Sequence, residues 1–376
     1  MMFFRKTACA AGLALLTLFT APAHAATDAR ANKTLHLFLS TSETGLDPAV
    51  ASDLASLNLM ENIFDPLLRY DYLARPVQLQ GNTARGMPSV EDGGRTYTFH
   101  LQPGIFFTPD PAFKGQPREV TAQDYVYSLT RLYDPSLKSP WLFLLEDKLV
   151  GDAALKATFS YDTPIAGLQA LDKYTLRIRL NAIDPNFLFY LAMPATAGVA
   201  REVAEAYPAP GQIGTHPVGT GPFLVKEWKR SDKIVLQANP TFRATVFHTE
   251  AKALAALPVD ARAIAIALEG KRLPLVERIE VRIVEEYQSR MLGFLKGEFD
   301  YLEQVPESMT DMVLENGALK PALAAKGLQL TRFPVLQTYY MWMNMDDPVL
   351  GGYTKDKLPC GAPSPSATTA AKTSRY

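Results

Sequence analysis

The chain has 376 residues, of which 47% are hydrophobic, and its formal net charge is -1. This length and composition suit a soluble globular protein with room for more than one domain. Because there is no basic excess, we expect neither nucleic acid nor an anionic membrane surface as a partner. The 16 tyrosines, 19 phenylalanines and 3 tryptophans are enough for large cores and for an aromatic ligand site.

The first 25 residues have the pattern of a secretory signal peptide. Arg5 and Lys6 precede an apolar run, Ala8 to Phe19, that is too short to span a bilayer. Residues 23–25 match the small-x-small cleavage pattern, so we expect cleavage after Ala25 and a periplasmic location. The alternative is an anchor that stays attached.

The cysteines exclude a disulfide framework. Only Cys9 and Cys360 are present, and Cys9 belongs to the predicted signal peptide. Cys9 lies near the start of the apolar run, where it is poorly placed for lipid modification. An exported protein of this size therefore depends on its core for stability.

After the signal peptide, strands and helices alternate. A largely buried strand is predicted over Thr34 to Ser40, and after a polar loop an amphipathic helix over Ser52 to Phe64. Leu67 to Tyr70 is extended. Arg95 to Leu101 alternates as a strand. Thr121 then begins a helix that runs to about Leu132, with Thr121 as N-cap and an acid in the first turn.

The middle of the chain continues this mixture. Tyr174 to Leu180 alternates most clearly as a strand, and helices are predicted over Asp184 to Leu191 and Arg201 to Tyr207. Ala244 to Leu275 is rich in alanine and is interpreted as an insertion with helical pieces.

The segment His216 to Phe223 predicts a rigid turn. Gly219 and Gly221 flank Thr220, and prolines stand outside both glycines. Glycine permits a left-handed backbone or a close backbone approach, and proline fixes φ. A hairpin follows, with strands over Phe223 to Trp228 and Ile234 to Ala238. We expect Gly219, Thr220 and Gly221 to form part of a hinge and not to contact the ligand. The alternative is a turn that serves only folding.

The last third predicts one more helix and several strands. The helix, Gln288 to Lys296, ends at Gly297. The predicted strands are Glu277 to Val284, Phe299 to Leu302, Leu328 to Phe333 and Tyr339 to Met345.

Motifs for catalysis and metal binding are missing from the sequence. No two histidines have metal-ligand spacing, and neither a Cys-x-x-Cys pair nor a Gly-x-Ser-x-Gly elbow is present. The adjacent carboxylates Glu91–Asp92, Glu285–Glu286 and Asp346–Asp347 are typical of solvated surface. We expect no cofactor, no metal and no enzyme, although a carboxylate pair far apart in the sequence leaves a secreted hydrolase as an alternative.

Several segments, in order, resemble the family 5 extracellular solute-binding proteins, the oligopeptide- and dipeptide-binding receptors of ABC importers. The resemblance runs from about Leu35 to Lys357. The segments that carry it are Gly94 to Phe107, Val120 to Ser128, Asp172 to Leu180, His216 to Pro240, Met291 to Leu302 and Tyr339 to Pro348.

The resemblance implies an α/β, two-lobed periplasmic-binding-protein fold of type II, in the large cluster with an extra subdomain. Lobe one is then discontinuous, with residues 34–63 and 181–300, and residues 64–180 form its subdomain. Residues 301–357 begin lobe two, which is incomplete. Ligand lies between the lobes, and the closed state is recognised by the ABC permease.

The expected ligand is a peptide or peptide-like solute, and the receptor is expected to be a monomer. The sequence does not distinguish a dipeptide, oligopeptide, opine, metal chelate or sugar. Loops at the carboxyl ends of strands are the default site, which selects Ser42, Glu43 and Thr44. Glu43 pairs with a cationic group or is a solvated loop acid. Further ligand-binding candidates are Tyr339, Tyr340, Trp342 and Asn344, with a core role as the alternative for the aromatic residues.

The end of the chain departs from the family pattern. Residues 358–376 are rich in Pro, Ser, Thr and Ala and lack any helical or strand period, so we expect disorder there. A shifted reading frame through this stretch can encode an amphipathic helix like the family's next element. The sequence therefore predicts a truncated, frame-shifted product, and a non-functional receptor fragment is a further alternative.

Overall fold

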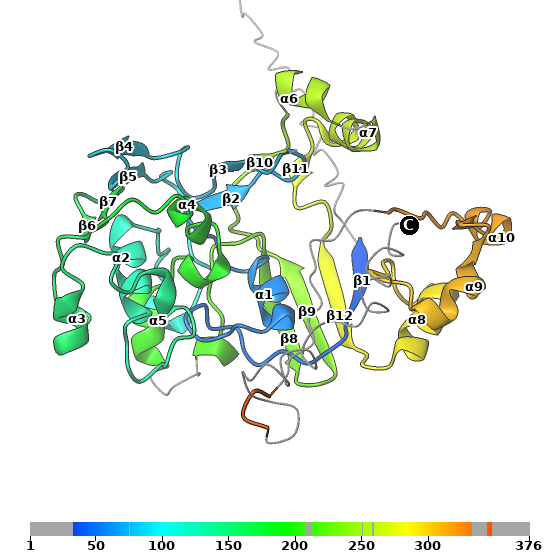
Figure 1. Cartoon of the computed structure of the whole chain (residues 1–376), viewed down its shortest axis with the longest axis horizontal. Coiled ribbons are helices and arrows are strands. Elements are labelled where there is room, and N and C mark those ends of the chain that lie inside the picture. Colours follow the sequence, from blue (N-terminus) through cyan, green and yellow to red (C-terminus); the bar gives the residue numbers. More distant parts are fainter. Residues whose placement is uncertain are drawn as a thin grey trace, which may run out of the picture. The chain divides into compact units, whose positions relative to one another are not determined.

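A computed structural model describes residues 33–74, 76–207, 213–249, 251–257, 259–332 and 344–347 (Figure 1). The predicted signal peptide and most of the tail from 333 onward lie outside these residues. The chain divides into two compact units, residues 1–305 and 306–376.

The first unit contains a four-stranded sheet with the order β1-β12-β9-β8. Its strands are β1 (Thr34–Leu39), β8 (Phe223–Lys229), β9 (Lys233–Ala238) and β12 (Arg278–Ile283). β1 and β12 are parallel, whereas β12 with β9 and β9 with β8 are antiparallel. The predicted hairpin is confirmed, and its sheet joins strands that are more than 180 residues apart in the sequence.

A second sheet has the order β4-β5-β7-β6 and is antiparallel throughout. Its strands are β4 (Ser89–Glu91), β5 (Thr96–His100), β6 (Leu168–Ala170) and β7 (Thr175–Arg179). The alternation predicted for β5 holds for Tyr97 and Phe99, which are buried, and for His100, which is exposed, but Thr96 on the predicted outer face is also buried. Smaller pairs are β2 (Leu68–Tyr70) with β3 (Leu79–Gly81) and β10 (Thr245–Val246) with β11 (Arg272–Leu273).

The helices of the first unit are short. They are α1 (Leu54–Met60), α2 (Ala122–Arg131), α3 (Ala153–Ala157), α4 (Phe187–Tyr190), α5 (Arg201–Ala206), α6 (Ala251–Ala256), α7 (Val259–Leu268) and α8 (Tyr287–Lys296). The predicted start of α2 is confirmed, since Thr121 and Asp124 form a capping box. The predicted end of α8 is also confirmed, because Gly297 has the left-handed φ of 81°.

Some predicted boundaries were wrong. The helix predicted over 52–64 covers only α1, since a turn begins at Glu61, and the helix predicted over 184–191 covers only α4. Residues 299–302 do not form a strand. Asp300 contacts the β1 edge through hydrogen bonds to and from the His36 backbone and through the His36 ring, and these contacts do not continue into a ladder.

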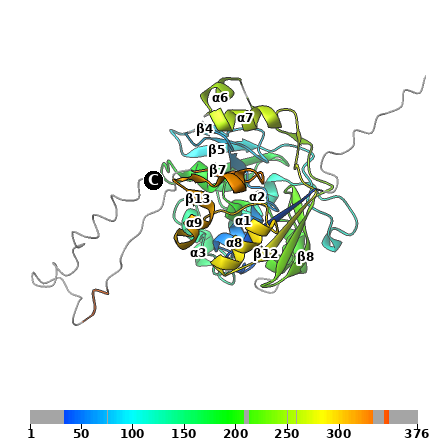
Figure 2. The same cartoon turned by 90° about the vertical axis from the view of Figure 1, so that its right-hand side faces the viewer.

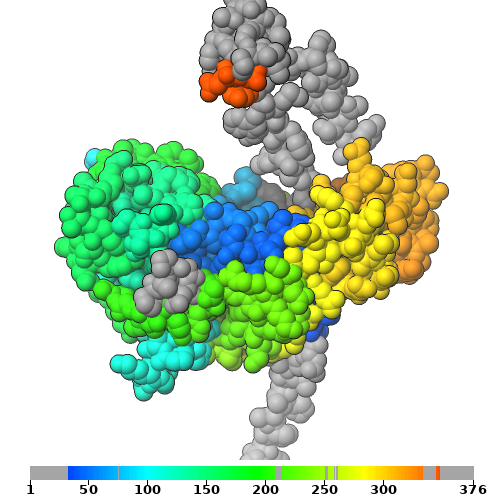
Figure 3. All heavy atoms as spheres, turned by 90° about the horizontal axis from the view of Figure 1, so that it is seen from below, coloured from blue at the N-terminus to red at the C-terminus, as the bar shows by residue number. Residues whose placement is uncertain are grey.

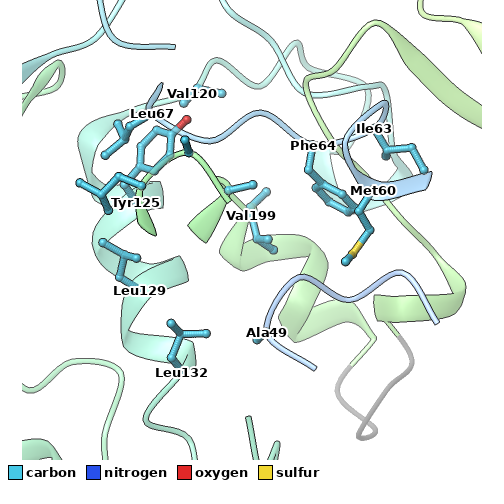
Figure 4. Packing of buried hydrophobic residues seen from close by; sticks show 14 of the residues in the cluster. Ala49, Met60, Ile63, Phe64, Leu67, Val120, Tyr125, Leu129, Leu132 and Val199 are labelled. Carbon is cyan, nitrogen blue, oxygen red and sulfur yellow. The ribbon is translucent and has the colours of Figure 1, made fainter. Parts of the chain in front are cut away.

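One hydrophobic core cluster draws on residues 46 to 281 and includes side chains of both four-stranded sheets. Figure 4 shows Tyr125, Leu129 and Leu132 along α2, with Val199 near them and Phe64 beside Met60. The hydroxyl of Tyr125 donates a hydrogen bond to the carbonyl oxygen of Asp65 at 3.0 Å. Burial raises the pKa of Tyr125 far above its ordinary value.

A buried ion pair joins α2 to the loop before α1. The two guanidinium nitrogens Nη1 and Nη2 of Arg131 lie 2.8 Å from the two carboxylate oxygens of Asp47. Both side chains are almost fully buried. This bidentate geometry satisfies the charges inside the core.

The second unit is small in the part that the structure describes. It contains α9 (Thr310–Val313), α10 (Pro321–Ala324) and the pair β13 (Leu314–Glu315) and β14 (Ala318–Leu319). The strand predicted over 328–333 was wrong for residues 328–332, which are irregular. Most of the strand predicted over 339–345 lies outside the described residues.

Candidate functional site

A groove of about 530 Å³, which we call the β1 groove, lies at the carboxyl end of β1. Its walls come from Phe38 to Thr41, from α1 and from the segment Tyr301 to Gln304. Figure 3 shows the blue segment that carries β1 and α1 next to the yellow segment that carries α8. Sheet residues such as Leu236 and Val281 give the groove an apolar lining. The groove lies where ligands bind in open α/β sheets.

Polar groups enter the β1 groove from several elements. Ser40, Thr41, Asn58 and Glu303 line it together with the buried Arg290 of α8. A concave, mostly apolar cavity with a few placed polar groups is the usual form of a solute site.

Arg290 is held from two sides. Its Nη1 donates hydrogen bonds to the carbonyl oxygens of Val284 and Glu285, at 3.0 and 3.2 Å. Its guanidinium also lies over the rings of Phe38 and Tyr287, with 5.5 and 4.3 Å to the ring centroids. Among the described residues no carboxylate pairs with it. Sequence reasoning missed this residue, because helical periodicity does not show which side chain is buried against a neighbouring strand.

The predicted loop residues Ser42, Glu43 and Thr44 follow the groove-lining Thr41 in the sequence, but none of them lines the β1 groove. Thr44 is exposed and tied to the start of α1, since its hydroxyl donates to Oδ2 of Asp53 at 2.5 Å and its N–H donates to Oγ of Ser56 at 3.1 Å. The solvated-acid alternative for Glu43 was wrong, because only 5% of this residue is exposed.

Glu43 has one satisfied and one unsatisfied oxygen. The indole N–H of Trp228 donates to Oε1 at 2.6 Å. Oε2, like the hydroxyl of Ser42, is buried and has no hydrogen-bond partner among the described residues. Buried acceptors are normally satisfied, so these two atoms are candidates for contact with a bound molecule.

The predicted turn packs its glycines against the turn that follows α1. A Cβ added at Gly219 would lie 2.0 Å from the carbonyl oxygen of Ile63, and one at Gly221 would lie 2.7 Å from that of Asn62. Neither glycine is among the residues with positive φ. The close-approach explanation is therefore correct here. Thr220 donates its hydroxyl to Asp65 at 2.9 Å, which ties the turn to the core.

Of the remaining candidates, only Asn344 lies among the described residues. Asn344 is exposed in the second unit, and its Oδ1 accepts a hydrogen bond from the N–H of Asp346 at 3.1 Å. Tyr339, Tyr340 and Trp342 lie outside the described residues.

Metal and membrane sites are not found in the described part of the chain. It contains no group of three or more His, Cys, Asp or Glu side chains that could hold a metal ion. Glu91–Asp92 and Glu285–Glu286 are exposed, and in the third pair Asp346 is exposed and Asp347 partly exposed, as expected of solvated surface. None of the described helices combines the length and apolar character needed to cross a membrane.

Comparison with known proteins gives consistent matches. Residues 78–356 match the model of the bacterial extracellular solute-binding proteins, family 5. The periplasmic oligopeptide-binding protein OppA of Escherichia coli is 30% identical over 204 residues, which cover 52% of this chain and 34% of OppA. A dipeptide-binding protein of Pseudomonas aeruginosa is 30% identical over 178 residues, which cover 45% of this chain and 32% of that protein.

The fold matches solved structures over part of their length. The periplasmic binding protein DppA of Helicobacter pylori, in complex with the peptide STSA, superposes with a TM-score of 0.57 at 21% identity. The match covers 74% of this chain and 48% of DppA. The mixed α/β fold therefore matches periplasmic peptide-binding proteins over part of their length. The chain spans about a third of the length of these curated relatives and about half of the solved chain.

Proposed function

Since the chain belongs to family 5 of the bacterial extracellular solute-binding proteins, we propose that it is a periplasmic receptor of an ABC importer for peptides or peptide-like solutes. The observation that carries the proposal is the family match over residues 78–356, because it covers more than half of the chain. The names of the matched relatives support peptides as the solute class. The receptor binds without changing its ligand chemically.

The proposed mechanism is a two-lobed clamp. Residues 34–63 and 181–300 belong to one lobe, residues 64–180 to its subdomain, and residues 301–357 to the start of the other lobe. A solute stabilises the closed clamp only if it binds that state better than the open one. The closed form, as a monomer, delivers the solute to the permease.

The β1 groove supplies one wall of the proposed site. Glu43 directs its unsatisfied oxygen to a cationic group of the solute, and Ser42 adds a hydrogen bond to the solute backbone. Thr44 holds the loop to α1, as its bonds to Asp53 and Ser56 support. Tyr339, Tyr340, Trp342 and Asn344 are proposed to contact the solute from the second lobe.

Thermal denaturation of the full-length protein with a panel of dipeptides and oligopeptides tests the solute class. A ligand at a hundred times its Kd stabilises the folded state by about 2.7 kcal/mol, which moves the melting temperature measurably. A shift with a sugar, an opine or a metal chelate but with no peptide contradicts the peptide assignment and keeps the receptor.

The Glu43→Gln variant tests the proposed contact. Glutamine keeps an oxygen that accepts the Trp228 N–H, so the loop remains attached, but it removes the charge. We expect peptide affinity to fall about tenfold, the usual scale of a charge-assisted hydrogen bond. Glu227→Gln, next to Trp228 in β8, is the matched control and is expected to bind like the wild type.

A further inference from the structure

A second cavity lies elsewhere in the first unit. This cavity, which we call the Arg69 pocket, has a volume of about 410 Å³. It shares no lining residue with the β1 groove. Its walls include Phe242, Pro222 and Leu273, so most of its lining is apolar. Its size is within the range of small-molecule sites.

The predicted insertion builds one wall of this pocket. Thr245 and Leu273 line it and pair with each other in the register of β10 and β11. Figures 1 and 2 show α6 and α7, which connect these strands, on the opposite side of the unit from β8. A separate small hydrophobic cluster, formed by Leu73, Leu257 and Ala265, holds the insertion against the segment after β2. The wall is thus fixed by its own packing.

Four charged side chains line the Arg69 pocket, and two of them neutralise each other. Nη1 of Arg243 lies 2.7 Å from Oδ2 of the buried Asp65. The second guanidinium nitrogen, Nη2, donates to Oδ1 of Asn82 at 2.7 Å. Asp65 also accepts hydrogen bonds from Asn82 and Thr220. This pair is therefore saturated by protein groups and belongs to the pocket wall.

The other two charges, Arg69 and Glu61, have opposite signs and no direct contact partner in the described part of the chain. Among the described residues neither side chain makes a hydrogen bond or an ion pair. Asp71, the nearest acid in sequence to Arg69, uses Oδ1 to accept the N–H groups of Leu73 and Ala74. Burial lowers the pKa of Arg69, and the Arg243 cation lowers it further, against the opposing attraction of the Asp65 and Asp71 carboxylates. Burial raises the pKa of Glu61. Both side chains reach solvent, yet their charged forms are less well hydrated than on an open surface.

We propose that the Arg69 pocket binds a small zwitterion of the α-amino acid class, separately from the solute in the cleft. The carboxylate of the amino acid pairs with the guanidinium of Arg69, whose planar fork suits a carboxylate. The ammonium group pairs with Glu61. The apolar lining around Phe242 and Leu273 receives an apolar side chain.

Calorimetric titration of the full chain with L-phenylalanine tests this proposal. We expect one saturable site. N-acetyl-L-phenylalanine lacks the ammonium charge, and L-phenylalaninamide lacks the carboxylate. Each of these two compounds is expected to bind at least about tenfold more weakly than L-phenylalanine, the scale of one lost charge-assisted contact.

Two variants assign the contacts. Arg69→Gln and Glu61→Gln are each expected to weaken L-phenylalanine binding about tenfold or more. Arg85→Gln and Glu91→Gln make the same changes at exposed positions that do not line the pocket, and they are expected to bind like the wild type.

The outcomes separate this site from the cleft. Peptide binding is expected to survive Arg69→Gln, and L-phenylalanine binding is expected to survive Glu43→Gln. The proposal is overturned if L-phenylalanine does not bind, if the N-acetyl form binds equally well, or if Arg69→Gln leaves binding unchanged. Loss of L-phenylalanine binding in Glu43→Gln alone would place the amino acid at the proposed peptide site beside Glu43 and also overturn the proposal.

Discussion

Gly219 and Gly221 show how a single hydrogen atom in place of a side chain permits a contact. Their backbone lies against the carbonyl groups of Asn62 and Ile63 in the turn after α1, and a hydrogen bond from the N–H of Gly221 to the carbonyl oxygen of Ile63 at 2.8 Å uses this closeness. The turn and α1 are therefore held together by main-chain contact, without a side chain between them.

We expect Gly219→Ala and Gly221→Ala each to lower the free energy of unfolding by about 1–3 kcal/mol, because the added Cβ overlaps backbone atoms. Urea denaturation measures the change. Gly86→Ala adds the same methyl group where no atom lies within 4 Å, and it is expected to change stability by less than about 0.5 kcal/mol. Equal stability of all three variants would contradict the packing argument.

Breaking the buried ion pair of Arg131 and Asp47 is expected to lower the free energy of unfolding more than the glycine substitutions do. Arg131→Met leaves the Asp47 carboxylate buried without its cation, which is expected to cost about 3–5 kcal/mol in chemical denaturation. Arg201→Met is the comparison, because Arg201 pairs with Asp162 and Glu205 at an exposed position, where a loss of at most about 1 kcal/mol is expected. Similar losses in both variants would rule out burial as the cause.

At the scale of elements, Asp53 joins helix α1 to the loop that carries Glu43. Its Oδ1 accepts the N–H of Ser56 at 2.8 Å as the N-cap of α1, and its Oδ2 accepts the hydroxyl of Thr44. Burial alone would raise the pKa of Asp53, but the hydrogen bonds from Ser56 and Thr44 outweigh it and hold the pKa below its ordinary value.

The N-cap at Asp53 predicts that part of the protein's stability depends on pH. Asp53→Ala is expected to lose about 1 kcal/mol of stability at pH 7, as for other N-caps. Because the folded-state pKa is depressed, the contribution is complete above the unfolded-state pKa of about 3.9 and disappears as the pH falls through the lower folded value. Urea denaturation from pH 7 to pH 3 measures the difference between wild type and variant.

Asp232→Ala provides the control for the cap. Asp232 is exposed in the hairpin turn, and its carboxylate makes no side-chain hydrogen bond among the described residues. The difference between Asp232→Ala and wild type is expected to stay flat over the same pH range. A flat difference for Asp53→Ala as well would refute the cap's role.

At the scale of the whole molecule, the main core and both cavities belong to the first unit. The core cluster uses residues 46 to 281, and the linings end at Gln304. We therefore expect a fragment of residues 26–305 to fold, with a cooperative thermal transition by circular dichroism.

A shorter fragment, which ends before strand β12, provides the contrast. This strand lies between β1 and β9, and a fragment ending at Glu277 lacks it. Such a fragment leaves β1 without a partner in this sheet and opens the core, so no cooperative transition is expected. A cooperative transition in the shorter fragment, or none in the longer one, would show that the core is divided differently.

Local patterns in the sequence were sufficient for the elements whose stability is local. The capping box at Thr121 and Asp124, the helix end at Gly297 and the hairpin before Asn239 depend on groups a few residues apart, and the sequence displays them directly. The family was likewise predictable from the sequence, because its motifs are short segments that follow one another in a fixed order along the chain.

Tertiary structure alone decided which charges are satisfied. Glu43 meets Trp228 across 185 residues, and Asp65 meets Arg243 across 178 residues. No periodicity records such distant contacts, because they depend on how the sheets and the turn pack. For the same reason the sequence showed Arg69 and Glu61 only as two charged residues near α1. Their position in one cavity, with the nearby acid and arginine already paired, is a property of the folded chain.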